Sequence, residues 1–253
     1  MRAVTGLSLE YAVRTDVGPV RENNEDAVFA SPRLAAVADG VGGAAAGEVA
    51  SRAAINALVH LDKCRLDRPL HLALSAAVAS GNAAIGFMAD CRPRMAGMST
   101  TLTAVALGDD GSFLVANVGD SRTYLLRDSA LTRLTRDDSL VQRLLDNGTV
   151  SAEEARRHPR RSLVLEALDG DPGRRPPALD TIAAQPGDRL LLCSDGLSDS
   201  VDDAAIAAVL GDADREACVE RLVAMALAAG ARDNVSVVVA DVVPRRDRSA
   251  AWA

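Results

Sequence analysis

The sequence predicts an α+β fold in which strands and helices occur in separate runs. Apolar segments of strand length follow one another closely, joined by turns rich in Gly, Asp and Pro. Longer segments with apolar residues three or four positions apart lie between and after these runs. Tight turns join antiparallel neighbours, whereas a parallel sheet would place a helix between successive strands. We therefore expect antiparallel sheets covered by helices, in one domain over residues 1–243 with a loose tail over 244–253.

The first third of the chain contains three predicted strands and a pair of helices. Alternating side chains mark the first strand, and Asp16-Val-Gly-Pro19 is typical of the turn that ends it. Leu70, Leu74 and Val78 recur at helical spacing in the second helix. The predicted elements are strands over residues 11–15, 27–30 and 34–38, and helices over 47–61 and 69–89.

The remaining two thirds alternate between strand runs and helices. Asp109-Asp-Gly111 is typical of a hairpin turn. A helix is expected to start at Thr135, and Ser151 with Glu154 forms a capping box for another. The other predicted elements are strands over residues 100–107, 112–118, 122–126, 179–183, 189–193 and 235–243, and helices over 203–210 and 214–229.

Composition excludes several classes of function. With 28 basic and 35 acidic residues the net charge is −7, and aromatic residues make up only 2%. Attraction to a phosphate backbone and stacking on bases are therefore both disfavoured, so no nucleic acid is expected as a partner. No apolar run approaches the length of a membrane span, and no Cys-x-x-Cys pair is present. We expect a soluble, cytoplasmic protein with reduced, mostly buried thiols and no membrane attachment.

Four aspartates occupy the same kind of position, because each lies at the end of a predicted strand. If the sheets bring these ends together, the carboxylates would repel one another unless a cation lay among them. An all-oxygen ligand set suits Mg²⁺ or Mn²⁺, and two such ions can activate a water and hold a phosphoryl group. Taken singly, each aspartate is also typical of a turn residue that caps its own backbone. The four residues are Asp39, Asp120, Asp195 and Asp233.

Arg21 lies in a polar loop after the first predicted turn. A guanidinium is the preferred bidentate partner of a phosphate, so Arg21 is a candidate to bind a phosphorylated substrate. The alternative is that it forms a surface ion pair.

Six motifs follow one another in an order typical of one enzyme family. They are Thr15–Asp26 (TDVGPVRENNED), Ala38–Gly43 (ADGVGG) with Gly47-Glu48, Gly97–Leu102 (GMSTTL), Val118–Arg122 (VGDSR), Leu191–Leu197 (LLCSDGL) and Asp233–Ser236 (DNVS). From Tyr11 to about Val243 the chain resembles the type 2C, or PPM-type, metal-dependent Ser/Thr protein phosphatases, especially their bacterial single-domain members. The resemblance implies a four-layer α-β-β-α sandwich of two antiparallel sheets flanked by helix pairs.

The resemblance also implies a metal centre of two Mn²⁺ or Mg²⁺ ions, with room for a third. Asp39 would bridge the two ions, and Glu25 would hold a metal-bound water with Asp26 in support. The third ion would be held by Asp120 and Asp195 with the carbonyl of Ser162. The other implied ligands are the carbonyl of Gly40 and the carboxylates of Asp195 and Asp233.

The implied activity is hydrolysis of phosphoserine and phosphothreonine on proteins by a metal-activated water. Arg21 would bind the phosphate and act with Asp39, Asp195 and Asp233, while a flap over residues 138–179 would select substrates. Expected partners are phosphorylated proteins, including the bacterial Ser/Thr kinases that the enzyme would oppose, and a monomer is expected. Two alternatives stay open: a phosphatase dedicated to an anti-sigma antagonist or similar regulator, and a catalytically weak scaffold that binds phosphoproteins.

Three positions depart from the family pattern. Val41 stands where many eukaryotic members have a His and bacterial ones a Met, so no side-chain acid is present there. Ser99 replaces a usual Gly and could disturb a close backbone approach. Glu166 occupies a flap position that is often Arg. Cys193 lies in an apolar strand without a phosphate loop, so a structural role is expected for it.

Overall fold

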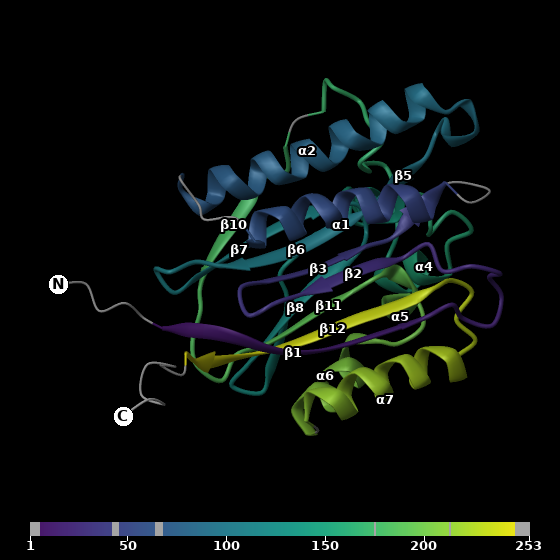
Figure 1. Cartoon of the computed structure of the whole chain (residues 1–253). Coiled ribbons are helices and arrows are strands. Elements are labelled where there is room, and N and C mark those ends of the chain that lie inside the picture. The colour runs from purple at the N-terminus through teal and green to yellow at the C-terminus, as the bar shows by residue number, and fades with distance from the viewer. Residues whose placement is uncertain (1–5, 42–45, 64–67, 175, 213, 246–253) are drawn as a thin grey trace.

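Two five-stranded antiparallel sheets face each other between two layers of helices (Figure 1). The computed structural model describes residues 6–41, 46–63, 68–174, 176–212 and 214–245. Gly42, Gly43, Cys64 and the predicted tail beyond Arg245 therefore lie outside the described residues. The predicted α+β class and the four-layer sandwich are both confirmed.

Each sheet combines strands from distant parts of the sequence. The first has the order β1 (Leu7–Asp16), β12 (Val235–Pro244), β11 (Arg189–Cys193), β8 (Arg122–Arg127) and β9 (Ala130–Arg133). The second has the order β10 (Leu179–Ala183), β7 (Ser112–Val118), β6 (Leu102–Leu107), β3 (Leu34–Ala38) and β2 (Ala27–Ala30). A short pair joins β4 (Gly40–Val41) to β5 (Ser99–Thr100).

Helix pairs cover the outer faces of the sheets (Figure 1). One pair lies over β3 and β6, and the other lies over β11 and β12. The first pair is α1 (Gly47–Lys63) and α2 (Leu70–Cys91), and the second is α6 (Asp203–Asp212) and α7 (Arg215–Ala228). Shorter helices are η1 (Pro93–Met95), α3 (Leu140–Asp146), α4 (Ala152–Arg157) and α5 (Asp195–Ser198).

Strand β11 shows why the core strands read as continuous apolar runs. Leu190 and Leu192 pack between the two sheets, whereas Leu191 and Cys193 pack against the helices of the second pair. Successive side chains of a strand point to opposite faces, and here both faces are buried. After Arg189, every residue of β11 is therefore apolar, whichever face of the sheet it points to.

Several local predictions need correction. The helix expected from Thr135 begins at Leu140, because Ser139 caps it and the hydroxyl of Thr135 accepts a hydrogen bond from Thr123 instead. The strand predicted over residues 100–107 is interrupted at Thr101, whose N–H donates to the carbonyl of Asp39. The pattern also missed the short elements β4, β9 and α5. The capping box of Ser151 and Glu154 is confirmed.

Helix α2 is long and apolar enough, by length and composition, to cross a membrane. Its many Ala residues raise the mean hydropathy of the whole helix, although polar residues interrupt the continuous apolar run that the sequence analysis considered. One face of α2 packs on α1 and the core beneath it, through Leu74, Val78 and Ile85. The same packing is found in core helices of globular domains. Among the described thiols, Cys193 and Cys218 are buried as predicted, but Cys91 is exposed.

Candidate active site

The four strand-end aspartates meet at one end of the sandwich. Asp39 directly follows β3 and Asp120 follows β7, and these two strands point the same way because both are antiparallel to β6. Asp195 lies just after β11 and Asp233 just before β12, and this antiparallel pair also places both at a common end. Residues almost 200 positions apart are therefore brought together by sheet topology.

The glycines that follow two of these aspartates permit close packing of backbones. A Cβ at Gly196 would lie 2.1 Å from the carbonyl oxygen of Asn234, next to Asp233. A Cβ at Gly40 would lie 2.4 Å from Gly47 and 2.7 Å from the carbonyl of Glu25. Neither glycine has the positive φ that a tight turn would require. Close approach of the backbones therefore explains both glycines without a left-handed backbone conformation.

Burial and like charge dominate the electrostatics of the cluster. Burial raises the pKa of Asp39 well above its usual range, and the nearby carboxylates of Asp26, Asp195 and Asp233 raise it further. The pKa of Asp195 is raised for the same reasons, by burial first and then by Asp120. Oδ1 of Asp195 and Oδ1 of Asp26 are buried without any hydrogen-bond partner. Buried carboxylates in this state are costly unless a cation compensates them.

The residues present fit hard divalent cations. Their donors are all oxygens, as Mg²⁺ and Mn²⁺ prefer, and two of these buried oxygens are unpartnered. In the described part of the chain, no three His, Cys, Asp or Glu side chains form a complete ligand set by themselves. Asp233 instead accepts a hydrogen bond from Arg21 at 2.6 Å. Carbonyl groups and waters would therefore have to complete the coordination.

Asp39 is fixed in place by two threonines to which the sequence argument gave no role. Thr100 Oγ1 and Thr101 N–H donate to the carbonyl of Asp39, at 2.8 and 2.9 Å. Thr101 Oγ1 accepts from the N–H of Asp39 at 3.1 Å. Both threonines belong to the GMSTTL motif. The sequence analysis used this motif to recognise the family but not to predict that the threonines support Asp39.

Asn234 is a second supporting residue that the sequence argument missed. Its Oδ1 accepts from the N–H of Glu25 at 2.8 Å, and its Nδ2 donates to the carbonyls of Val17 and Asn23. The side chain thereby ties the loop that carries Arg21 to the start of β12. A neighbouring hydrogen bond, from Ser194 Oγ to Asp26 at 2.9 Å, leaves the other oxygen of Asp26 unpartnered.

Arg21 and Glu25 both lie beside the cluster. The hydrogen bond to Asp233 raises the pKa of Arg21, whose side chain is half exposed. The ion-pair interpretation therefore describes this structure, and phosphate binding by Arg21 stays a prediction. Glu25 is partly buried, and its carbonyl accepts hydrogen bonds from Gly40 and Ser51.

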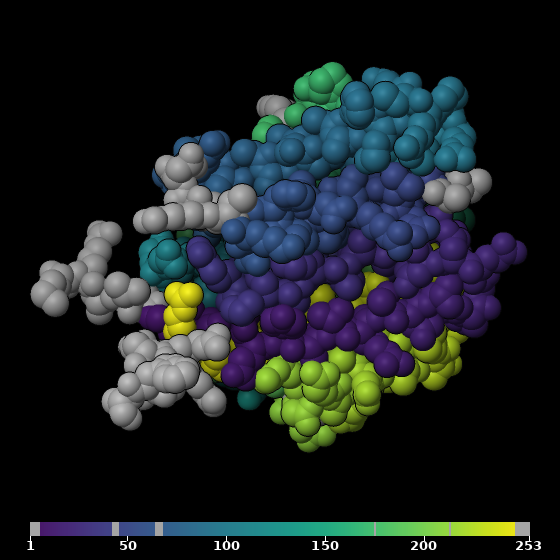
Figure 2. Space-filling model, viewed as in Figure 1, coloured from purple at the N-terminus to yellow at the C-terminus, as the bar shows by residue number. Residues whose placement is uncertain are grey.

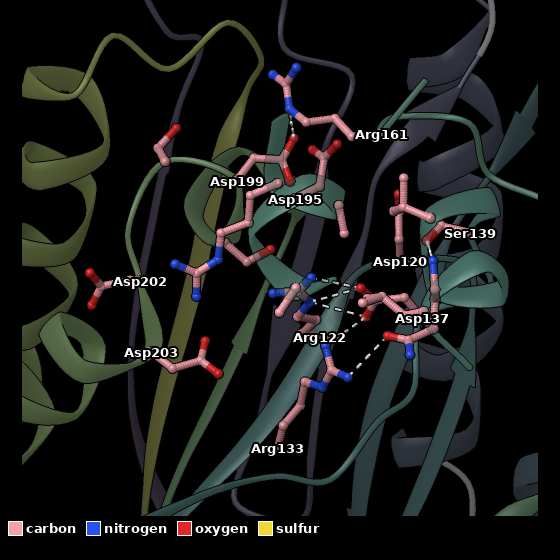
Figure 3. Close-up of a pocket in the computed structure, with 18 of the residues that line it drawn as sticks. Asp120, Arg122, Arg133, Asp137, Ser139, Arg161, Asp195, Asp199, Asp202 and Asp203 are labelled. Atoms are coloured by element: carbon pink, nitrogen blue, oxygen red, sulfur yellow. Dashed lines mark hydrogen bonds and ion pairs between the residues drawn. The ribbon is translucent and has the colours of Figure 1, made fainter. Parts of the chain in front are cut away.

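A pocket of about 720 Å³ extends from the cluster to residues of the 139–161 segment (Figure 3). Asp120 and Asp195 line it together with Asp199, which pairs with Arg161 and was not anticipated. Burial, followed by the charge of Asp137, raises the pKa of Asp120 to about 7. Ser162 is exposed and does not line this pocket, so the structure does not bring its side chain to Asp120. The carbonyl role of Ser162 stays a prediction.

Most of the chain matches a model of a known protein family. The model described as protein phosphatase 2C matches residues 20–233. The chain belongs to the protein phosphatase 2C family. The resemblance inferred from the six motifs is thereby confirmed.

Relatives in this family include named phosphatases. The serine/threonine protein phosphatase PstP of Mycobacterium tuberculosis H37Rv is 50% identical over 237 residues, which cover 94% of this chain and 46% of that protein. This chain thus spans about half the length of that curated relative. The serine/threonine phosphatase stp of Listeria innocua is 37% identical over 206 residues, covering 78% of this chain and 81% of the relative.

A solved structure of the PstP catalytic domain in complex with two manganese ions superposes with a TM-score of 0.87. It is 48% identical, and the match covers 94% of this chain and 99% of that one. The protein phosphatase 2C fold is therefore shared over the whole four-layer sandwich.

The departures from the protein phosphatase 2C pattern are accommodated locally. Ser99 pairs with Val41 between β5 and β4, and its hydroxyl donates to the carbonyl of Val41 at 3.2 Å. The effect of the Ser99 Cβ on a close backbone approach stays a prediction. Glu166 forms an ion pair with Arg174. Burial raises the pKa of Cys193 to about 12, which favours an inert thiol there.

We expect the metal-free protein to lose thermal stability as the pH rises. Burial raises the folded-state pKa of Asp26 to about 6 and of Asp120 to about 7, from 3.8. Because the folded state binds these protons more tightly than the unfolded state, their stabilising contribution is complete below the unfolded pKa and is lost as the pH rises through the folded values. Melting temperatures in chelator should fall between about pH 5 and about pH 8. A free Mn²⁺ concentration of 100 times its Kd should raise the free energy of unfolding by about 2.7 kcal/mol. A flat pH profile in chelator, or no gain with Mn²⁺, would contradict this.

Proposed function

We propose that this chain hydrolyses phosphoserine and phosphothreonine in proteins with the help of Mn²⁺ or Mg²⁺. The observation that supports this most is the buried set of aspartates at the strand ends, with an unpartnered oxygen on Asp195. Asp39, Asp195, Asp233 and the carbonyl of Gly40 would hold two ions. Bound there, the ions would lower the pKa of a water and offset the charge that develops on the phosphoryl group.

The chain's own groups have separate tasks in this proposal. The half-exposed guanidinium of Arg21 can exchange its carboxylate partner for the phosphate of a substrate, because both are oxyanions that accept two N–H groups. Thr100 and Thr101 hold the backbone of Asp39 in place through hydrogen bonds, and Asn234 holds the Arg21 loop against β12. Val41 offers no proton, so the leaving serine or threonine oxygen would take its proton from water.

The same proposal extends to the substrates of the enzyme, the extent of its domain and its cellular location. Phosphorylated proteins, including Ser/Thr kinases, would be substrates of a monomeric enzyme. A single catalytic domain would span residues 1–243, with residues 138–179 as the flap and a third ion near Asp120. The thiols of Cys91 and Cys193 are free, which fits a reducing cytoplasm.

The test is phosphate release from a phosphothreonine peptide with and without Mn²⁺. Release that needs the metal is expected. Folded protein that releases nothing at any metal concentration would favour the scaffold alternative. A phosphorylated anti-sigma antagonist hydrolysed far faster than kinase-type phosphopeptides would favour the dedicated regulator phosphatase.

Exposed arginines of the flap are expected to attract phosphorylated segments. Arg161 pairs with Asp199 and Arg157 with Glu153, whereas Arg156 lines the 720 Å³ pocket. Replacing Arg156 by Gln should raise KM for phosphopeptides roughly threefold, because local positive charge raises the concentration of anions. Arg143→Gln on α3, which does not line this pocket, is the control. An unchanged KM at low salt would remove this role.

A further inference from the structure

The last part of the flap is connected to the candidate metal ligand Asp39 through one threonine. Leu168 and Thr100 exchange two backbone hydrogen bonds, with N···O distances of 2.8 and 2.9 Å. Thr100 also donates through Oγ1 to the carbonyl of Asp39 at 2.8 Å. Leu168 is therefore attached to a residue that directly contacts Asp39, which places this part of the flap beside the candidate active site.

A side chain of α2 grips the flap just beyond this point. Oδ1 of Asn82 accepts from the N–H of Gly170 at 2.9 Å, and Nδ2 donates to the carbonyl of Asp171 at 2.9 Å. Asn82 is 8% exposed, so both amide groups are used away from solvent. A buried amide with all its visible bonds on one loop acts as a clamp for that loop.

The backbone of the flap also touches α2 directly, one turn after Asn82. A Cβ at Gly86 would lie 2.7 Å from the carbonyl oxygen of Gly170, and a Cβ at Gly170 would lie 2.4 Å from Gly86. Gly170 has a φ of 86°, which other residues rarely adopt. Figure 2 shows the flap (green) seated against α2 (blue) on the surface of the molecule. The contact therefore needs glycine on both sides.

We propose that Asn82 is a positioning residue that holds the flap beside the candidate active site. The inference rests on the proposed phosphatase function, because the flap matters for substrates larger than the phosphate group. Helix α2 is anchored to α1 and the core, so it is a fixed support for the clamp. Without the Asn82 amide, Gly170 N–H loses this partner, Asp171 C=O keeps only the hydrogen bond from Arg174 N–H, and the flap shifts toward water.

Two independent changes test the clamp. Asn82→Ala removes both hydrogen bonds, and Gly86→Ala pushes the flap outward while leaving Asn82 intact. Alanine is a better helix former than glycine, so the second change does not weaken α2 itself. In both variants KM for a phosphothreonine peptide should rise about tenfold. kcat/KM for p-nitrophenyl phosphate, which needs only the metal centre, should stay within about twofold.

Amide hydrogen exchange supplies a readout that does not depend on catalysis. Exchange at Leu168 and Gly170 should become about tenfold faster in both variants. Ser80→Ala, at an exposed position of the same helix, is the control and should change neither exchange nor KM. Unchanged peptide KM in both variants, or equal losses on both substrates, would overturn the clamp. A wild-type chain without metal-dependent hydrolysis of p-nitrophenyl phosphate would instead overturn the proposed function on which it rests.

Discussion

Asp39→Asn is expected to slow metal-dependent hydrolysis of a phosphothreonine peptide about 10³-fold. This corresponds to a loss of about 4 kcal/mol of transition-state stabilisation. Asp39 is buried, with Asp26, Asp195 and Asp233 as charged neighbours. Asparagine has the same shape and keeps the hydrogen bonds that Thr100 and Thr101 make to the backbone of residue 39. The change therefore removes the charge that a cation needs while leaving the backbone in place.

Stability distinguishes this effect from a folding defect. Because burial and like charge raise the pKa of Asp39, a neutral side chain should leave the metal-free melting temperature unchanged or higher. The gain in melting temperature with Mn²⁺ should disappear in Asp39→Asn and in Asp195→Asn. Asp180→Asn, at an exposed position of β10, should behave as wild type. Full activity of Asp39→Asn with Mn²⁺ would contradict the assignment of the metal centre.

Gly196→Ala is expected to cause the second large effect, on both stability and activity. The added Cβ would lie 2.1 Å from the carbonyl oxygen of Asn234, and its neighbours there are backbone and Val235. Backbone cannot yield as a flexible side chain can, so α5 and the start of β12 must separate. Overpacking of this kind costs about 1–3 kcal/mol. The same movement would part Asp195 from Asp233, so hydrolysis should fall about 100-fold.

Gly211→Ala is the matched control for that substitution. Gly211 lies in α6, and a Cβ there meets nothing within 4 Å. Alanine at this position should raise stability by about 0.5–1 kcal/mol and leave activity unchanged. Urea denaturation and Mn²⁺-dependent turnover of both variants would check the pair. Equal behaviour of the two variants would show that the close approach at Gly196 is not required.

Local patterns in the sequence were enough to predict most elements. Alternation, turn residues and capping signals placed the strands and both helix pairs within a few residues. Short elements were missed, because β4 and β9 have too few residues to show a period. The helix expected at Thr135 failed because Thr135 and Asp137 serve tertiary contacts, to Thr123 and Arg122.

The candidate site was predictable in composition but not in arrangement. Motif order identified the family, and position at the ends of predicted strands named Asp39, Asp120, Asp195 and Asp233. Neither assigned a role to Asn234, Thr100 or Asp199. These residues act through hydrogen bonds and ion pairs to partners remote in sequence, and a local pattern carries no record of such partners.

By itself, the sequence determined the α+β class, the order of the elements and the family, because each follows from short-range periodicity or from ordered motifs. Only the tertiary structure decided that the four aspartates share one end of the sandwich, since this depends on which strands are neighbours. It also decided that Gly196 must be small, that Arg21 pairs with Asp233, and that Asn82 bonds to the backbone of Gly170 and Asp171. Each of these is a contact between residues more than 35 positions apart, which chain proximity cannot specify and packing must.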